Sequence, residues 1–276
     1  MPLSSTNTSR FLIEADEVSL ETGGPLVLDT RTPEDYLAGH IPGSINLCTY
    51  ECFVRSTSSI GLNRFAKEQA ERYKDAGVSR SHPIVVYDGN IGMRAARECW
   101  MLNYIGHSNA KILIGGMNGW ISGQMPVSTE STQLPTADFQ ADPQADMVIG
   151  ISGIVAQSGI EKVTILDVRS HAEFSGTDGS KCCGRQGRLP GAIRIEWSQF
   201  LDEHTGAFKH PEVIREIVKA AGISTDHEII PYCHRGARSS VAYYALKHAG
   251  YSRVKNFIGS WHEWAARNDI PVESGS

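Results

Sequence analysis

A short polar segment that begins at Cys233 holds the side chains best suited to nucleophilic chemistry. The segment, residues 233–240, follows an apolar run at 229–232 and precedes a helical pattern at 237–249. At a helix N-terminus, the unpaired N–H groups and the helix dipole both favour an anion. Three neighbouring side chains add positive potential: His234, Arg235 and Arg238. These surroundings favour the thiolate of Cys233, which is the nucleophilic form of the side chain.

The alternative for Cys233 is an inert buried thiol, which is the usual state of an isolated cysteine. The polar and charged residues around it are poor core neighbours, so we predict a reactive thiolate. The predicted active-site loop contains six further residues: His234, Arg235, Gly236, Ala237, Arg238 and Ser239. Gly236 is expected to allow a tight or left-handed turn within this loop.

The composition of the 276-residue chain excludes several classes of protein. Hydrophobic residues make up 41% of the chain and the net charge is −5, which suits a folded protein and not a nucleic-acid binder. The longest apolar runs are far shorter than the roughly 20 residues of a membrane-spanning helix. The six cysteines include no Cys-x-x-Cys pair, so no disulfide framework or metal site is expected. With a polar N-terminal segment, the protein is predicted to be soluble and cytoplasmic, without a membrane or nucleic-acid partner.

An internal repeat indicates two copies of one fold. The sequence Leu-Asp-Thr-Arg-Thr-Pro-Glu-Asp-Tyr at 28–36 corresponds to Leu-Asp-Val-Arg-Ser-His-Ala-Glu-Phe at 166–174, and each is followed by a Gly-x-x-Pro-Gly sequence. Both copies also end on similar segments that contain glycine and tryptophan, at 114–120 and 258–264. One large domain would not explain these matches, whereas two homologous domains do.

The predicted domains are residues 10–121 and 147–274, joined by a proline-containing polar linker at 122–146. Within each copy, apolar runs alternate with helical patterns. The predicted strands are 26–28, 84–87, 163–166 and 229–232. The predicted helices are 62–76, 94–104, 211–221 and 237–249. This alternation favours parallel βαβ units, which bind ligands beyond the C-terminal ends of their strands.

Taken together, these motifs resemble the tandem-domain rhodaneses, which include thiosulfate sulfurtransferase and 3-mercaptopyruvate sulfurtransferase. The resemblance covers residues 11–272 and rests on the Asp-x-Arg and Gly-His-Ile-Pro-Gly block, the cysteine loop, and the closing Gly-Ser-Trp-x-Glu-Trp at 259–264. It implies an α/β fold with two rhodanese-like domains, each a mostly parallel sheet flanked by helices. It also implies that only the second copy is catalytic, because Asp88 stands at the position of Cys233 and cannot accept sulfane sulfur.

The resemblance further implies a two-step transfer without a metal or organic cofactor. Cys233 would take the outer sulfur of a donor as a persulfide, and cyanide or a thiol would then remove it. Backbone N–H groups of residues 234–239 would hold the persulfide, and Arg235 and Arg238 would attract an anionic donor. Arg169 matches a family arginine that points into the active site, with a structural salt bridge as the alternative. Asp167 is expected to support the loop.

The charged loop favours thiosulfate as the donor. Mercaptopyruvate enzymes of this family usually carry an uncharged Cys-Gly-Ser-Gly-Val loop, and they often place an arginine near the position of Glu173. Two arginines in the loop suit a dianion better, so 3-mercaptopyruvate remains the alternative donor. A second alternative is a persulfide carrier that delivers sulfur to a protein partner, and a thiol protein such as thioredoxin is a candidate acceptor.

A phosphatase on the same fold is a weaker alternative. Such enzymes need the spacing Cys-x5-Arg, whereas Arg238 lies one position earlier, and Ser239 occupies the required place. The vicinal pair Cys182 and Cys183 has two interpretations, either simple accessible thiols, which we favour, or a redox switch that resolves the Cys233 persulfide.

Overall fold

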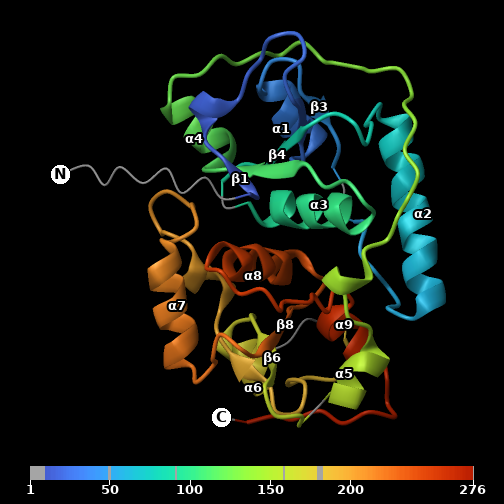
Figure 1. The fold of residues 1–276 in the computed structure, drawn as a ribbon, viewed down its shortest axis with the longest axis vertical. Coiled ribbons are helices and arrows are strands. Elements are labelled where there is room, and N and C mark those ends of the chain that lie inside the picture. The colour runs from blue at the N-terminus through green and yellow to red at the C-terminus, as the bar shows by residue number, and fades with distance from the viewer. Residues whose placement is uncertain (1–9, 49–50, 91, 158, 179–182, 276) are drawn as a thin grey trace.

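The computed structural model describes residues 10–275 except 49–50, 91, 158 and 179–182. It contains two α/β domains, one above the other in Figure 1, and the chain between them passes along the outside of the first domain. No helix in the described ranges has the length and apolar character needed to cross a membrane. The two-domain α/β fold with parallel sheets, predicted from the repeat and the family resemblance, is confirmed.

The first domain is built on a five-stranded parallel sheet in the order β1-β5-β4-β2-β3. Its elements are β1 (Leu12–Ile13), η1 (Ala15–Glu17), β2 (Leu26–Asp29), α1 (Pro33–Ala38), β3 (Ile45–Asn46), α2 (Ser59–Asp75), β4 (Ile84–Tyr87), α3 (Met93–Tyr104), β5 (Ala110–Leu113) and α4 (Gly116–Ser122). The predicted strands 26–28 and 84–87 correspond to β2 and β4. The predicted helices 62–76 and 94–104 correspond to α2 and α3.

The second domain repeats this order around the parallel sheet β7-β6-β8. Its elements are η2 (Ala145–Met147), α5 (Ile151–Gln157), β6 (Val163–Asp167), α6 (His171–Ser175), β7 (Ile193–Arg194), η3 (Trp197–Phe200), α7 (Pro211–Ala220), β8 (Glu228–Tyr232), α8 (Ala237–His248) and α9 (Ser260–Ala265). Two parallel bridges, Ile229 to Val254 and Val148 to Asn256, continue the sheet where β5 and β1 lie in the first domain.

The segment between α4 and η2 forms no further helix or strand, apart from one bridge between Ser128 and His40. The domain boundaries at 121 and 147 stay a prediction.

The domains themselves meet through α3 and α8, which face each other across the boundary (Figure 1). One hydrophobic core runs through both helices and both sheets. Asn103 on α3 also donates to the Tyr244 hydroxyl on α8 at 3.0 Å.

A buried ion pair explains why the Asp-x-Arg motif occurs in both copies. Asp167 at the end of β6 accepts from the Arg169 guanidinium at 2.6 Å, and from the Tyr232 hydroxyl at the end of β8. The same guanidinium donates to the Gly187 carbonyl at 2.7 Å. Arg169 is 2% exposed and Asp167 is fully buried. The cluster therefore joins two strand ends to the Gly-x-x-Pro-Gly turn.

The first copy contains the equivalent cluster. Asp29 accepts from Arg31 at 2.6 Å and from the Tyr87 hydroxyl, and Arg31 donates to the Gly39 carbonyl at 2.7 Å. The repeated sequence thus produces the same contacts at the same strand ends.

We expect Asp167→Ala to lower the free energy of unfolding by about 3–5 kcal/mol, because Arg169 would stay buried without its counter-charge. Urea unfolding followed by circular dichroism would measure the loss. The matched control is Asp226→Ala, which removes the partner of Lys162 from an exposed ion pair. This control should leave the unfolding midpoint almost unchanged. Equal small shifts in both variants would contradict the structural role of the buried cluster.

Candidate active site

Cys233 lies directly after β8, at the start of the loop that leads into α8. Its side chain is 1% exposed, and the Gly236 N–H group donates to Sγ at 3.1 Å. The Cys233 N–H group donates to the Ser260 hydroxyl at 3.1 Å, and that hydroxyl lies 3.9 Å from Sγ. The sulfur therefore faces a backbone donor at a helix N-terminus, a setting that favours an anion.

Gly236 makes this geometry possible. Its φ of +91° is left-handed, which confirms the turn predicted at this residue. A Cβ atom here would lie 2.5 Å from the Ile258 side chain. Ser239, the last residue of the predicted active-site loop, lies in the first turn of α8, where its buried hydroxyl donates to the Gly236 carbonyl at 3.1 Å. Ser239 thus stabilises the turn from behind.

The beginning of α9 holds the loop from the other side. The Trp261 N–H group donates to the Cys233 carbonyl and the His262 N–H group to the His234 carbonyl, both at 3.0 Å. The closing Gly-Ser-Trp motif is therefore bonded to the backbone on both sides of the cysteine. Trp261 is also buried in the core of the second domain. Sequence reasoning missed Ser260 and His262, because nothing in that motif alone indicates which loop it contacts.

Arg238 forms a two-point ion pair with Glu173, with N–O distances of 2.7 and 2.8 Å. Burial would raise the pKa of Glu173, but the hydrogen bonds and charge of Arg238 outweigh it and lower that pKa to about 2. The carboxylate therefore offsets much of the charge that we expected Arg238 to present to a donor.

Arg169 was expected to point into the active site. The structure places it in the buried cluster with Asp167 and the Gly187 carbonyl, stacked 4.7 Å from the Trp261 ring. This is the structural salt bridge of the alternative interpretation, so we leave Arg169 out of the binding site. Asp167 supports the strand end beside the loop, in the position expected of it.

Arg235 contacts the other domain. Its guanidinium carbon lies 4.5 Å from the ring centroid of Phe53, in the loop that precedes α2. The rings of Phe53 and His262 meet edge-on with their centroids 5.0 Å apart. The guanidinium carbon of Arg55 lies 5.6 Å from the Phe53 centroid. Phe53 and Arg55 were missed by the sequence analysis, because they lie about 180 residues from Arg235 and carry no motif.

A pair of short hydrogen bonds fixes this loop against the second domain. The backbone N–H and the hydroxyl of Thr57 both donate to the Glu263 carboxylate at 2.6 Å. Both residues are buried, and burial raises the pKa of Glu263 despite the bonds from Thr57. In Figure 1 the chain enters α2 beside α9, which carries Glu263. The Thr57–Glu263 contact therefore places Phe53 and Arg55 beside the Cys233 loop.

The equivalent loop in the first domain is filled by its own carboxylate. Asp88 follows β4 as Cys233 follows β8, and its carbonyl accepts from the Met117 N–H group at 2.8 Å. Its two carboxylate oxygens accept from four backbone N–H groups at 2.9 to 3.4 Å: Asn90, Gly92, Arg94 and Ala95. In the first domain, the Asp88 carboxylate therefore takes up the N–H groups of its own loop. In the second domain, the Cys233 sulfur lies at the equivalent place.

His234 turns toward Cys183, with Nε2 3.5 Å from Sγ. Burial, reinforced by the charges of Arg235 and Arg238, lowers the pKa of His234 to about 4. His234 is therefore neutral near pH 7, which corrects our expectation that it adds positive potential.

Cys182, the other half of the vicinal pair, lies outside the described residues. Within the described part of the chain, no three metal-ligating side chains gather into a group that could hold an ion.

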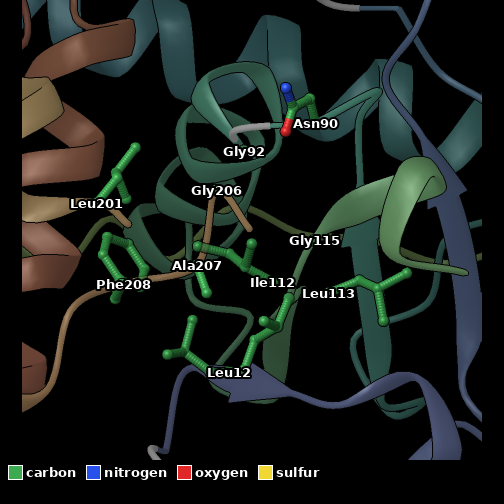
Figure 2. Close-up of a pocket in the computed structure, with 11 residues that line it drawn as sticks. Leu12, Asn90, Gly92, Ile112, Leu113, Gly115, Leu201, Gly206, Ala207 and Phe208 are labelled. Carbon is green, nitrogen blue, oxygen red and sulfur yellow. The ribbon is translucent and has the colours of Figure 1, made fainter. Parts of the chain in front are cut away.

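One pocket is lined by residues of both domains (Figure 2). Leu12 and Ile112 line it from the first domain, and Leu201 and Phe208 line it from the second. Among the described residues that line this pocket, none belongs to the Cys233 loop and none carries a charged side chain.

The family model for the rhodanese-like domain matches the chain twice, over residues 14–123 and 155–267. A putative thiosulfate sulfurtransferase of Haloferax volcanii is 30% identical over 250 residues, 88% of this chain and 86% of the relative. The 3-mercaptopyruvate sulfurtransferase of Escherichia coli is 30% identical over 247 residues, 89% of this chain and 87% of the relative. The anaerobic ergothioneine biosynthesis enzyme of Chlorobium limicola superposes with a TM-score of 0.84 at 21% identity, over 97% of this chain and 71% of that one. This last likeness shows the fold alone.

We expect Gly236→Ala to slow alkylation of Cys233 by iodoacetamide, because the new methyl group would collide with Ile258 and displace the N–H donor. Mass spectrometry of the modified peptide over time would measure the rate. Gly222→Ala is the control, since its φ of +79° carries similar backbone strain, while a Cβ there would meet no atom of the described residues within 4 Å. An unchanged alkylation rate in Gly236→Ala would contradict the role of this turn.

The lowered pKa of His234 predicts a loss of stability in acid. Between its unfolded value of 6.5 and its folded value of about 4, the unfolded chain takes up a proton that the folded chain does not. Stability should therefore fall as the pH is lowered through this window. His234→Gln should lose less stability than the wild type between pH 7 and pH 4.5 in urea unfolding. Identical losses in both proteins would count against the assignment.

Proposed function

The chain belongs to the rhodanese family of sulfurtransferases, and we propose that it moves sulfane sulfur from thiosulfate to cyanide or a thiol through a persulfide on Cys233. The observation that carries this proposal is the Gly236 N–H group, 3.1 Å from the Cys233 sulfur at the start of α8. A donor in this position stabilises a thiolate before the transfer and an anionic persulfide after it.

In the first step, the Cys233 thiolate attacks the outer sulfur of thiosulfate. The sulfur–sulfur bond of thiosulfate breaks, sulfite leaves with the bonding electron pair, and Cys233 becomes a persulfide. In the second step, cyanide attacks the outer sulfur of the persulfide and leaves as thiocyanate, which restores the thiolate. A thiol acceptor would leave as a persulfide in the same way. The covalent intermediate divides the reaction into two displacements, which predicts ping-pong kinetics.

The choice of donor rests on charge, because relatives named for thiosulfate and for 3-mercaptopyruvate have the same identity to this chain. Arg238 contributes little free charge, since Glu173 pairs with it. Arg235 has no carboxylate partner among the described residues, and its Nε atom is buried without a hydrogen-bond partner. The Arg235 guanidinium beside the cysteine, without a carboxylate partner among the described residues, favours a doubly charged donor over one with a single carboxylate.

Asp88 supports the assignment of the transfer to one domain. Its carboxylate is bonded to the loop amides of the first domain and offers no sulfur nucleophile. The first domain is therefore proposed to shape the site and not to carry sulfur.

Intact mass spectrometry after treatment with thiosulfate tests the proposal. We expect the wild type to gain one sulfur atom on Cys233 and to lose it when cyanide is added, while Cys233→Ser gains none. A parallel sample treated with 3-mercaptopyruvate separates the two donors. A persulfide that forms only with 3-mercaptopyruvate would contradict the choice of thiosulfate, and no adduct with either donor would contradict the transfer itself. A stable persulfide with little cyanide-dependent turnover would indicate delivery to a protein partner.

A further inference from the structure

Two arginines and a histidine gather at the domain boundary with no carboxylate partner for the arginines among the described residues. Arg235 and Arg55 both lie near the Phe53 ring, at 4.5 and 5.6 Å from its centroid, and His262 meets the same ring edge-on. We call these three residues, Arg55, Arg235 and His262, the boundary cluster. Two of them belong to the catalytic domain and one belongs to the first domain.

The two arginines of the boundary cluster lack the carboxylate partners that the other arginines near the site have in the described part of the chain. Arg169 pairs with Asp167, and Arg238 pairs with Glu173. None of the ion pairs among the described residues includes Arg55 or Arg235. Two guanidinium groups held near one ring without a carboxylate leave a positive potential that an anion would offset.

Unused hydrogen-bond donors lie in the same place. The Arg235 Nε atom and the His262 Nδ1 atom are both buried and have no hydrogen-bond partner in the described part of the chain. Burial, and then the charges of Arg235 and Arg55, lower the pKa of His262, so the field of both arginines reaches this ring. Buried polar atoms without partners are uncommon in native proteins, and these two donors are available to a hydrogen-bond acceptor on a bound anion.

We propose that Arg55, Arg235 and His262 bind the oxyanion end of the sulfur donor, so that the first domain supplies a specificity-determining residue to the second. This assignment rests on the proposed transfer through Cys233. In that reaction, the sulfonate-like end of thiosulfate leaves as sulfite with the bonding electron pair, and its three oxygens need donors next to the cysteine loop. Arginine suits such a group because its planar donors can bind two oxygens at once.

The structure also explains how Arg55 is kept in position. Arg55 itself is exposed, but Thr57, two residues further on, is 4% exposed and bonded to Glu263. Glu263 follows His262 on α9, whose first residues are bonded to the Cys233 loop. The backbone from Arg55 to Thr57, the Thr57–Glu263 hydrogen bonds and the bonds from α9 to the loop therefore connect the arginine of the first domain to the cysteine of the second.

Steady-state kinetics of Arg55→Ala test the proposal. We expect the KM for thiosulfate to rise by about tenfold, the effect of losing one charged hydrogen bond, with little change in the KM for cyanide. Product inhibition by sulfite should weaken by a similar factor. A residue with only a structural role would not separate the two substrates. Arg55→Lys, which keeps the charge but not the planar donors, should lie between the wild type and Arg55→Ala.

Arg64→Ala is the matched control. Arg64 lines the same surface hollow as Arg55, but it pairs with Glu68 at 3.3 Å, and its removal changes the net charge equally. If Arg64→Ala raises the KM for thiosulfate as much as Arg55→Ala does, general attraction explains the effect and the subsite is wrong. An unchanged KM in Arg55→Ala overturns the subsite alone, provided that the wild type forms the Cys233 persulfide. If the wild type forms no persulfide, the proposed function fails first.

Discussion

The hydrogen bond from the Gly236 N–H group to the Cys233 sulfur is the contact on which the rest of the site depends. It requires a left-handed residue between β8 and α8, and the space beside Ile258 leaves no room for a side chain there. Once this turn forms, α8 begins at Ala237 and its N-terminal end faces the sulfur. Backbone groups in this position need no reorganisation when charge moves onto or away from the cysteine.

The two domains share the same arrangement of strand ends and loop but differ in the residue that begins the loop. In both domains, a buried aspartate joins an arginine, a tyrosine and a glycine carbonyl at the strand ends, and the following loop is bonded to the beginning of a later helix. The loops differ in the side chain at their first residue. Asp88 provides a permanent carboxylate, whereas Cys233 provides a sulfur that can accept and release a further atom in the proposed reaction. This difference in the first residue of the loop is the basis on which we assign the proposed transfer to the second domain.

The first domain is more than a support, because its contacts reach the reactive loop directly. Thr57 is bonded to a buried carboxylate on α9, and Phe53 lies against Arg235. The shared core between α3 and α8 holds the domains together and so helps to keep these contacts in place. The proposed active site therefore lies at the domain boundary and draws residues from both domains.

Much of this could be predicted from local patterns. The duplicated blocks, the alternation of apolar runs and helical patterns, and the glycine after the cysteine are determined by neighbouring residues, so the fold, the position of Cys233 and the turn at Gly236 were predictable. The sequence alone also separated the two loops, since Asp88 stands where the second copy has a cysteine. Which arginines remain available for a ligand was decided only by the tertiary structure. Glu173 lies 65 positions from Arg238 and neutralises it, Arg169 is buried beside Asp167, and Phe53 and Arg55 come from the other domain. The residue types alone could not reveal these pairings, because charge compensation depends on which side chains packing brings together.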